Sequence, residues 1–251
     1  METLPALHDD LASQITTLAQ RYRRANGPVV TLLNRFGNRI EEALRVLPEA
    51  ARDRIESVTN QALERAFSVA VLGRHAPAMG ARATQAVAML TGAAGGIGGL
   101  ATSLAEIPVT ITVFLHVIAR AAEAEGFDPN APEIRAECLR VLSSGSPLAT
   151  DDGVNTAFLS ARLTLTGPAV SGLLATVAPG FAAILTRKLA AQAVPVLGAV
   201  TGAALNAAYL SYYRELAEIR FALLRLGALH GAERVVADFA RATQPPRVTK
   251  G

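Results

Sequence analysis

The sequence predicts an all-α protein: a multi-helix bundle with two Gly/Ala-rich apolar helical hairpin regions and an amphipathic N-terminal helical arm. Composition is the first reason. Half of the residues are apolar (51%), but Ala and Gly supply much of that share, Trp is absent and aromatic residues make up 5%, which favours closely packed helices over a β-sandwich or barrel. The second reason is that apolar residues recur at helical spacing over long stretches. The third is a pair of charge-free runs, residues 83–105 and 189–213.

The N-terminal part of the chain carries amphipathic stretches that proline or glycine closes. We expect helices over residues 6–25, 29–47 and 49–72. We assign residues 1–54 to an amphipathic arm, 55–240 to the main helical domain and 241–251 to a disordered tail. Arginine-rich segments in the arm could meet phosphates or anionic lipid, but interspersed acids favour a solvated helix face.

The two charge-free runs contain glycines four residues apart, which lie on one face of a helix and allow close approach of a second backbone. These helix-packing glycines are Gly92, Gly95, Gly96, Gly99, Gly198 and Gly202. Each run is long enough to cross a bilayer, yet only weakly hydrophobic. Membrane insertion and a tightly packed soluble hairpin therefore both remain open.

Prolines and glycines also set the expected boundaries of the later helices. Pro108 suits a first helical turn and Gly126 a C-terminal stop, which predicts a helix over residues 108–125. Further helices are expected from Pro132 to about residue 143 and from about residue 150 to 165, and a short apolar segment between Gly167-Pro168 and Pro179-Gly180. An amphipathic helix follows the second charge-free run, and its inward residues are expected to be Leu216, Ile219, Leu223, Leu226 and Leu229.

Glu106 is the one acid flanked by two uncharged segments, and a buried carboxylate needs a partner. His116 and Arg120 lie on the same predicted helix but more than two turns away, so a partner from another helix is favoured. Asn206, in an apolar stretch, could form a hydrogen bond across to Glu106 or to a neighbouring backbone, as a structural latch. The candidate functional polar residues are Glu106, His116, Arg120 and Asn206.

One motif suggests an enzyme. Residues 91–98, TGAAGGIG, resemble the T-G-x-x-x-G-x-G loop with which short-chain dehydrogenases bind a dinucleotide. The context disagrees, because helical patterns precede the loop and no Tyr-x-x-x-Lys exists: the lysines are Lys188 and Lys250. An NAD(P)-dependent dehydrogenase is therefore a remote alternative, and we expect no cofactor.

Other classes of function find no support in the sequence. The single cysteine, Cys138, and the scattered histidines form no metal-binding motif, and no catalytic motif or nucleic-acid-binding motif is present. The N-terminus METLPALHDD lacks the basic and apolar regions of a signal peptide. We therefore expect the chain to start in the cytoplasm.

Four segments together resemble the EcsC family, over roughly residues 55–235. They are GAAGGIGGLATSLAEIP (92–108), HVIARAAEAEGFDP (116–129), AFLSARL (157–163) and KLAAQAVPVLGAVTGAALNAAY (188–209). The chain has Glu106 where Asp is commoner in the family and Phe127 where Tyr is common. The resemblance implies a helical, bacterial, membrane-associated protein, named for an operon that also encodes an ABC-type exporter. It implies architecture and no chemistry.

Two hypotheses of function follow. The first is a non-enzymatic, membrane-associated helical protein on the cytoplasmic side, which binds lipid or a membrane protein partner such as an ABC-type exporter. The second is a soluble helical enzyme or ligand-binding domain with a pocket where Glu106, Arg120 and Asn206 converge. The sequence names no substrate for either.

Overall fold

The computed structural model describes residues 5–25, 44–72, 99–143, 170–192 and 198–244, with a few single residues between 27 and 42 and between 86 and 90. Within these ranges the chain forms helices and no strand, which confirms the all-α prediction. The helices are α1 (Pro5–Ala25), α3 (Glu49–Leu72), α5 (Gly99–Ala124), α6 (Pro132–Ser143), α8 (Val170–Gln192), α9 (Gly198–His230) and α10 (Ala232–Thr243). Residues 91–98, the loop that resembles a dinucleotide site, lie outside the described residues, but the described part contains no sheet to carry such a loop.

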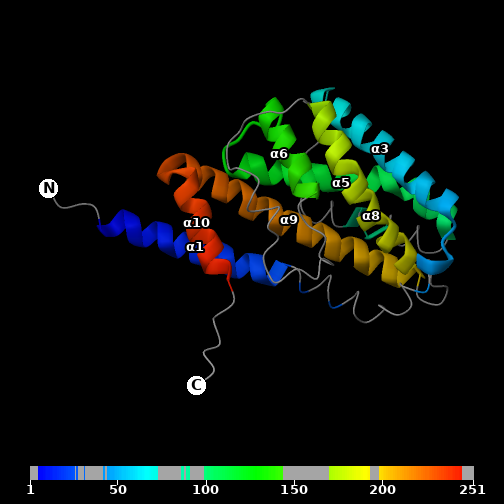
Figure 1. Cartoon of the computed structure of the whole chain (residues 1–251), viewed down its shortest axis with the longest axis horizontal. Helices are drawn as coiled ribbons and strands as arrows, with labels where there is room; N and C mark the ends of the chain where they lie inside the picture. Colours follow the sequence, from blue (N-terminus) through cyan, green and yellow to red (C-terminus); the bar gives the residue numbers. More distant parts are fainter. Residues whose placement is uncertain are drawn as a thin grey trace, which may run out of the picture.

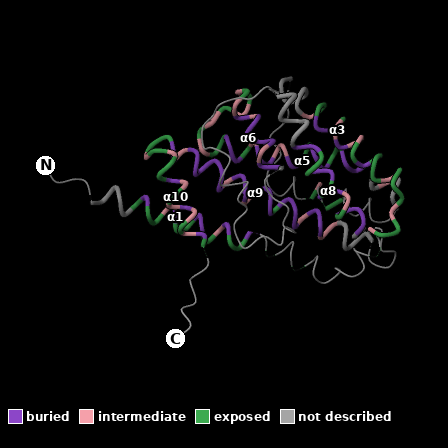
Figure 2. Tube along the Cα trace, viewed as in Figure 1, coloured by how far each residue is buried: buried purple, intermediate pink, exposed green. Residues whose placement is uncertain are grey.

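Helix α9 is the centre of the bundle (Figure 1). It has 33 residues, roughly 50 Å at a rise of about 1.5 Å per residue, and it packs against α1, α5, α6, α8 and α10. Buried residues follow it along most of its length (Figure 2). The expected inward residues Leu216, Ile219, Leu223 and Leu226 are buried.

Leu229 was expected to face inward and is 67% exposed. That prediction is wrong because Leu229 lies in the last turn of α9, just before the chain turns back at Gly231 into α10. Helical spacing predicts which residues are buried only where other helices pack against the helix, and the last turn of α9 is left exposed at Leu229.

Helices α5 and α9 run parallel, because their contacts keep a nearly constant offset along the chain. Glu106 meets Asn206 at one end, Phe114 stacks near Tyr213 with ring centroids 5.0 Å apart, and Glu125 pairs with Arg225 at the other end. Helix α8 runs in the opposite direction, since Lys188 lies at the level of Glu106 and Phe181 at the level of Tyr213.

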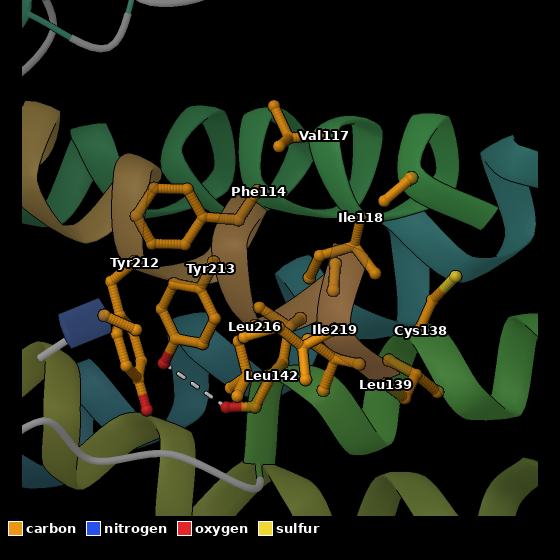
Figure 3. Packing of buried hydrophobic residues seen from close by; sticks show 14 of the residues in the cluster. Phe114, Val117, Ile118, Cys138, Leu139, Leu142, Tyr212, Tyr213, Leu216 and Ile219 are labelled. Atoms are coloured by element: carbon orange, nitrogen blue, oxygen red, sulfur yellow. Dashed lines mark hydrogen bonds between the residues drawn. The ribbon is translucent and has the colours of Figure 1, made fainter. Parts of the chain in front are cut away.

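Helix α6 is also antiparallel to α9, and it joins the same core. Figure 3 shows the Tyr213 hydroxyl pointing at α6, where it donates a hydrogen bond of 3.3 Å to the backbone oxygen of Leu142. Phe114 and Ile118 of α5 and Leu139 of α6 lie around the same part of α9. Helix α3 packs against α5 and α8 on the side of the bundle away from α1 and α10.

The predicted N-terminal helix is packed into the bundle. Leu11, Ile15 and Leu18 of α1 are buried in the common core, and α1 contacts α9 and α10. Arg21 donates to Glu215 of α9 at 2.5 Å and also pairs with Glu218. Helix α10 ends at Thr243, three residues into the segment expected to be a tail.

Two prolines lie where the sequence predicted helix boundaries. Pro108 was expected in a first turn, but α5 begins nine residues earlier at Gly99; Pro179 was expected to close a segment, but it lies within α8. An interior proline removes one backbone hydrogen bond. Both prolines lie on exposed positions, so the opposite, packed face of each helix can hold the helix together.

Gly126 ends α5 as predicted. Its φ is 86°, a value that favours glycine, and its N–H donates to the carbonyl of Glu123 at 3.0 Å. The N–H of Phe127 donates to the carbonyl of Ala122 at 3.0 Å, which completes a Schellman motif. The helix expected from about residue 150 to 165 lies outside the described residues.

Candidate functional site

Glu106 lies on the inner face of α5 and is 5% exposed. Residues four apart share a helix face, and Thr110, one turn later, is buried on the same face. Its hydroxyl donates to Glu106 Oε1 at 3.2 Å. The sequence prediction that Glu106 would be buried and would need a partner is confirmed.

The other partners of Glu106 come from two other helices. Lys188 Nζ of α8 and Asn206 Nδ2 of α9 each donate to Glu106 Oε1 at 2.6 Å. Lys188 is 2% exposed and Asn206 1%. We call Glu106, Thr110, Lys188 and Asn206 the Glu106 cluster. It joins the three helices at the end of the bundle where α5 and α9 begin and α8 ends.

Burial governs the electrostatics of this cluster. Desolvation lowers the pKa of the Lys188 ammonium, and the Glu106 carboxylate acts in the opposite direction by its charge and its hydrogen bond. Such a pair is stable only when its hydrogen bonds are well made, because both ions have lost their hydration. One oxygen of Glu106 already accepts from three donors, which suits a latch between helices better than a site for general acid or base chemistry.

The hydrogen bond from Asn206 to Glu106, one of the two possibilities that the sequence left open, is present. Lys188, which directly follows Arg187, was not among the candidate residues named from the sequence. A signal existed: Lys188 is one of two lysines in a chain whose other cations are arginines, and it stands directly before a charge-free run.

Arg120 does not join the cluster. It lies 14 residues after Glu106, which corresponds to roughly 21 Å along α5, and it is more than half exposed and paired with Glu123 at 2.5 Å. The predicted convergence of Glu106, Arg120 and Asn206 is therefore wrong. A rotation of about 40° relative to Glu106 is enough to turn Arg120 away from the packed face.

His116 lies at the edge of the packed face of α5 and is half-buried. Its Nε2 is buried, and among the described residues it has no hydrogen-bond partner. It takes no part in the Glu106 cluster.

Of the glycines predicted to pack helices closely, Gly99 and Gly198 are the first residues of α5 and α9, and Gly202 lies in the first turns of α9. Gly92, Gly95 and Gly96 lie outside the described residues. Close backbone approach at these glycines stays a prediction.

A second buried ionic group, which the sequence analysis missed, lies between α6 and α9. Glu137 is fully buried and accepts from Arg220 Nη2 at 3.0 Å and from Nε at 3.1 Å, while its other oxygen pairs with Arg140. Burial also raises the pKa of the neighbouring Cys138 thiol to about 12, and the Glu137 charge adds to that shift. In the described part of the chain, no three His, Cys, Asp or Glu side chains are grouped as a metal ion would require.

Helix α5 also has the length and composition of a membrane-spanning helix. The segment Leu104–Ala124 has a mean hydropathy of 1.5, and half of it is buried inside the bundle. A core helix of a soluble protein can share these properties, so what its other half exposes is the more informative feature.

The fold and the cluster define an all-α bundle whose charged and amide groups join apolar helices in its interior. The model of the EcsC protein family matches residues 31–226. This match covers most of the chain, and the protein belongs to that family. Helices α1 and α10 lie outside the matched residues. Comparisons with curated proteins and with solved structures gave no significant match.

Proposed function

We propose that this EcsC-family protein is a non-enzymatic, membrane-associated protein that binds the cytoplasmic face of a bilayer through the outer side of α5. The observation that carries the proposal is the distribution of polar groups on this helix. Glu106 and Thr110 point inward, whereas the exposed positions in the same turns are Ala105, Pro108 and Val109.

The outward side of α5 carries no Asp, Glu, Lys or Arg over four turns. We call it the outer face of α5; its exposed or half-exposed residues are Ala105, Pro108, Val109, Thr112, Leu115, His116 and Ala119. The stretch is roughly 21 Å long and ends where Arg120 pairs with Glu123. Charges inside and apolar groups outside are expected where lipid rather than water surrounds a helix.

The hydroxyl on this face is compatible with an apolar environment. Thr112 Oγ1 donates to the carbonyl of Pro108 at 2.8 Å, so its donor is satisfied within the helix. Transfer of this face out of water therefore leaves no hydroxyl proton unbonded.

We infer that α5 lies against the bilayer and does not cross it. Helices α3, α6, α8 and α9 all pack against α5, and a span would have to abandon these contacts and expose Glu106 to lipid. The family resemblance adds a membrane protein partner such as an ABC-type exporter as a second candidate for the same surface. We favour lipid over a protein partner at this surface, because contact with lipid requires no complementary shape.

The test is flotation of the purified protein with vesicles of phosphatidylethanolamine and phosphatidylglycerol, for the wild type, Thr112→Glu and Thr112→Lys. Thr16→Glu is a matched control, because Thr16 is an exposed threonine of α1 that also donates to the carbonyl four residues earlier at 2.8 Å. We expect both Thr112 variants to lose about tenfold or more in partitioning, and Thr16→Glu to behave as the wild type.

The negative and positive variants of Thr112 distinguish burial in the apolar part of the bilayer from electrostatic contact with its head groups. Loss with Glu but gain with Lys would indicate an electrostatic contact with anionic lipid instead of burial of the outer face of α5. A wild-type protein that stays in solution at ordinary salt would refute the proposal.

A further inference from the structure

The described residues just before the glycine-rich segment include two exposed large apolar side chains. Met89 is 44% exposed and Leu90 is 70% exposed. Val87 in the same helical stretch is partly buried and packs against the core. Among the described residues of this segment, Val87 therefore contacts the bundle while Met89 and Leu90 are exposed.

The surroundings of these two residues are free of charge. The sequence has no charged residue between Arg82 and Glu106, and Glu106 is buried. From residue 86 to residue 119, the described positions expose no charged side chain. The chain thus leads from Met89 and Leu90 to the outer face of α5 without an exposed charge among those positions.

We propose that Met89 and Leu90 form an anchor that inserts into the acyl region of the bilayer. This inference rests on the proposed membrane association and names the residues that enter the lipid. The two described side chains by themselves are too few for a stable interface with a second copy, which buries about 800 Å² per partner. Lipid accepts an apolar group of any shape, and its affinity increases with the apolar area buried.

The chain offers a matched control. Leu229 is 67% exposed, almost as much as Leu90, but it lies in the last turn of α9. That end of α9 is remote from the end of the bundle where α5 begins, and α5 is the helix that follows Met89 and Leu90 along the chain. Leu229 therefore shows how a similarly exposed leucine behaves when it does not contact the membrane.

The chain also suits site-specific labelling, because its one cysteine, Cys138, is buried. We would label Leu90→Cys and Leu229→Cys separately with an environment-sensitive nitrobenzoxadiazole probe. Vesicles of phosphatidylethanolamine and phosphatidylglycerol, with and without nitroxide-labelled acyl chains, would then be added. Circular dichroism would check the fold of each labelled protein, and Leu90→Asp and Leu229→Asp would be compared in flotation.

The expected result is a blue shift and nitroxide quenching of the probe at position 90, none at position 229, and at least tenfold weaker flotation for Leu90→Asp alone. A probe at position 90 that keeps its spectrum in water, on a protein that still floats with vesicles, overturns the anchor but leaves the proposed function intact. A blue shift without vesicles shows that protein already covers position 90 and also overturns the anchor. Absence of flotation overturns both proposals.

Discussion

Replacement of Lys188 by Met should destabilise the fold strongly, although the two side chains have similar length. Lys188 Nζ lies 2.6 Å from Glu106 Oε1, and both side chains are almost fully buried. The substitution removes the ammonium and leaves a buried carboxylate with only the neutral donors Thr110 and Asn206 from the Glu106 cluster.

The expected size of the effect follows from the balance of two large terms. At 2.6 Å the pair attracts by about 6 kcal/mol at an effective dielectric constant of about 20. Desolvation of the two ions opposes this by several kcal/mol per ion, so the intact pair comes near to balance, whereas loss of one partner costs about 3–5 kcal/mol. Such a loss is a large part of the stability of a folded domain, about 5–15 kcal/mol.

The assay is urea unfolding followed by far-ultraviolet circular dichroism. Lys188→Met should lose about 3–5 kcal/mol of unfolding free energy, and Glu106→Leu/Lys188→Met should recover most of that loss because no unpaired ion remains. Arg187→Met, an exposed neighbour on α8, is the control and should stay within about 0.5 kcal/mol of the wild type. A cost below about 1 kcal/mol for Lys188→Met, or a double variant less stable than the single one, would refute this account of the cluster.

Three further predictions concern the buried groups around α9. Arg220→Met should cost about 3 kcal/mol in the same urea assay because it leaves Glu137 buried with one partner fewer, whereas Arg225→Met breaks a partly exposed pair and should cost at most about 1 kcal/mol. Burial raises the pKa of Tyr209, Tyr212 and Tyr213 of α9 above 10.0. The stability that their burial gives is therefore complete below pH 10 and is lost as the pH rises further, so tyrosine ionisation, followed by absorbance at 295 nm, should coincide with unfolding. The Cys138 thiol should resist Ellman's reagent at pH 8 and react once urea unfolds the chain, because its pKa is raised to about 12 and its side chain is buried; rapid reaction of the folded protein would contradict its burial.

The helices that the sequence predicted best are those with local boundary signals. Helix α3 covers residues 49–72 as expected, α6 begins at Pro132, and α5 ends where Gly126 allows a positive φ. These boundaries depend on a few neighbouring residues. The start of α5 and the continuity of α8 could not be predicted in this way, because tertiary packing held a helix through Pro108 and Pro179 against their local preference.

The Glu106 cluster could be predicted from the sequence only in part. An acid between two uncharged segments needs a buried partner, and Asn206 was one of few polar groups available in the second run. The sequence gives no distance between α5 and α8, so the place of Lys188 before the charge-free run did not identify it as the partner of Glu106. Arg120 lies too far along α5 to reach Glu106, as its separation in the sequence indicated, and it pairs with Glu123 instead.

The helices of this bundle place their charges in two opposite ways, and the contrast bears on the proposed membrane contact. Helix α3 exposes Arg52 and Glu64, as a helix in water does. Helix α8 shows both patterns, because Lys188 points inward and Pro179, Gly180 and Ala183 are exposed, but Arg187 is exposed as well. A buried ion pair adds little net stability compared with apolar residues of the same size, so the Glu106–Lys188 pair gives no reason for the outer face of α5 to be apolar. The proposed contact with lipid supplies such a reason, and it predicts that charges added on the exposed side of α5 weaken membrane binding while the same charges on α3 leave it unchanged.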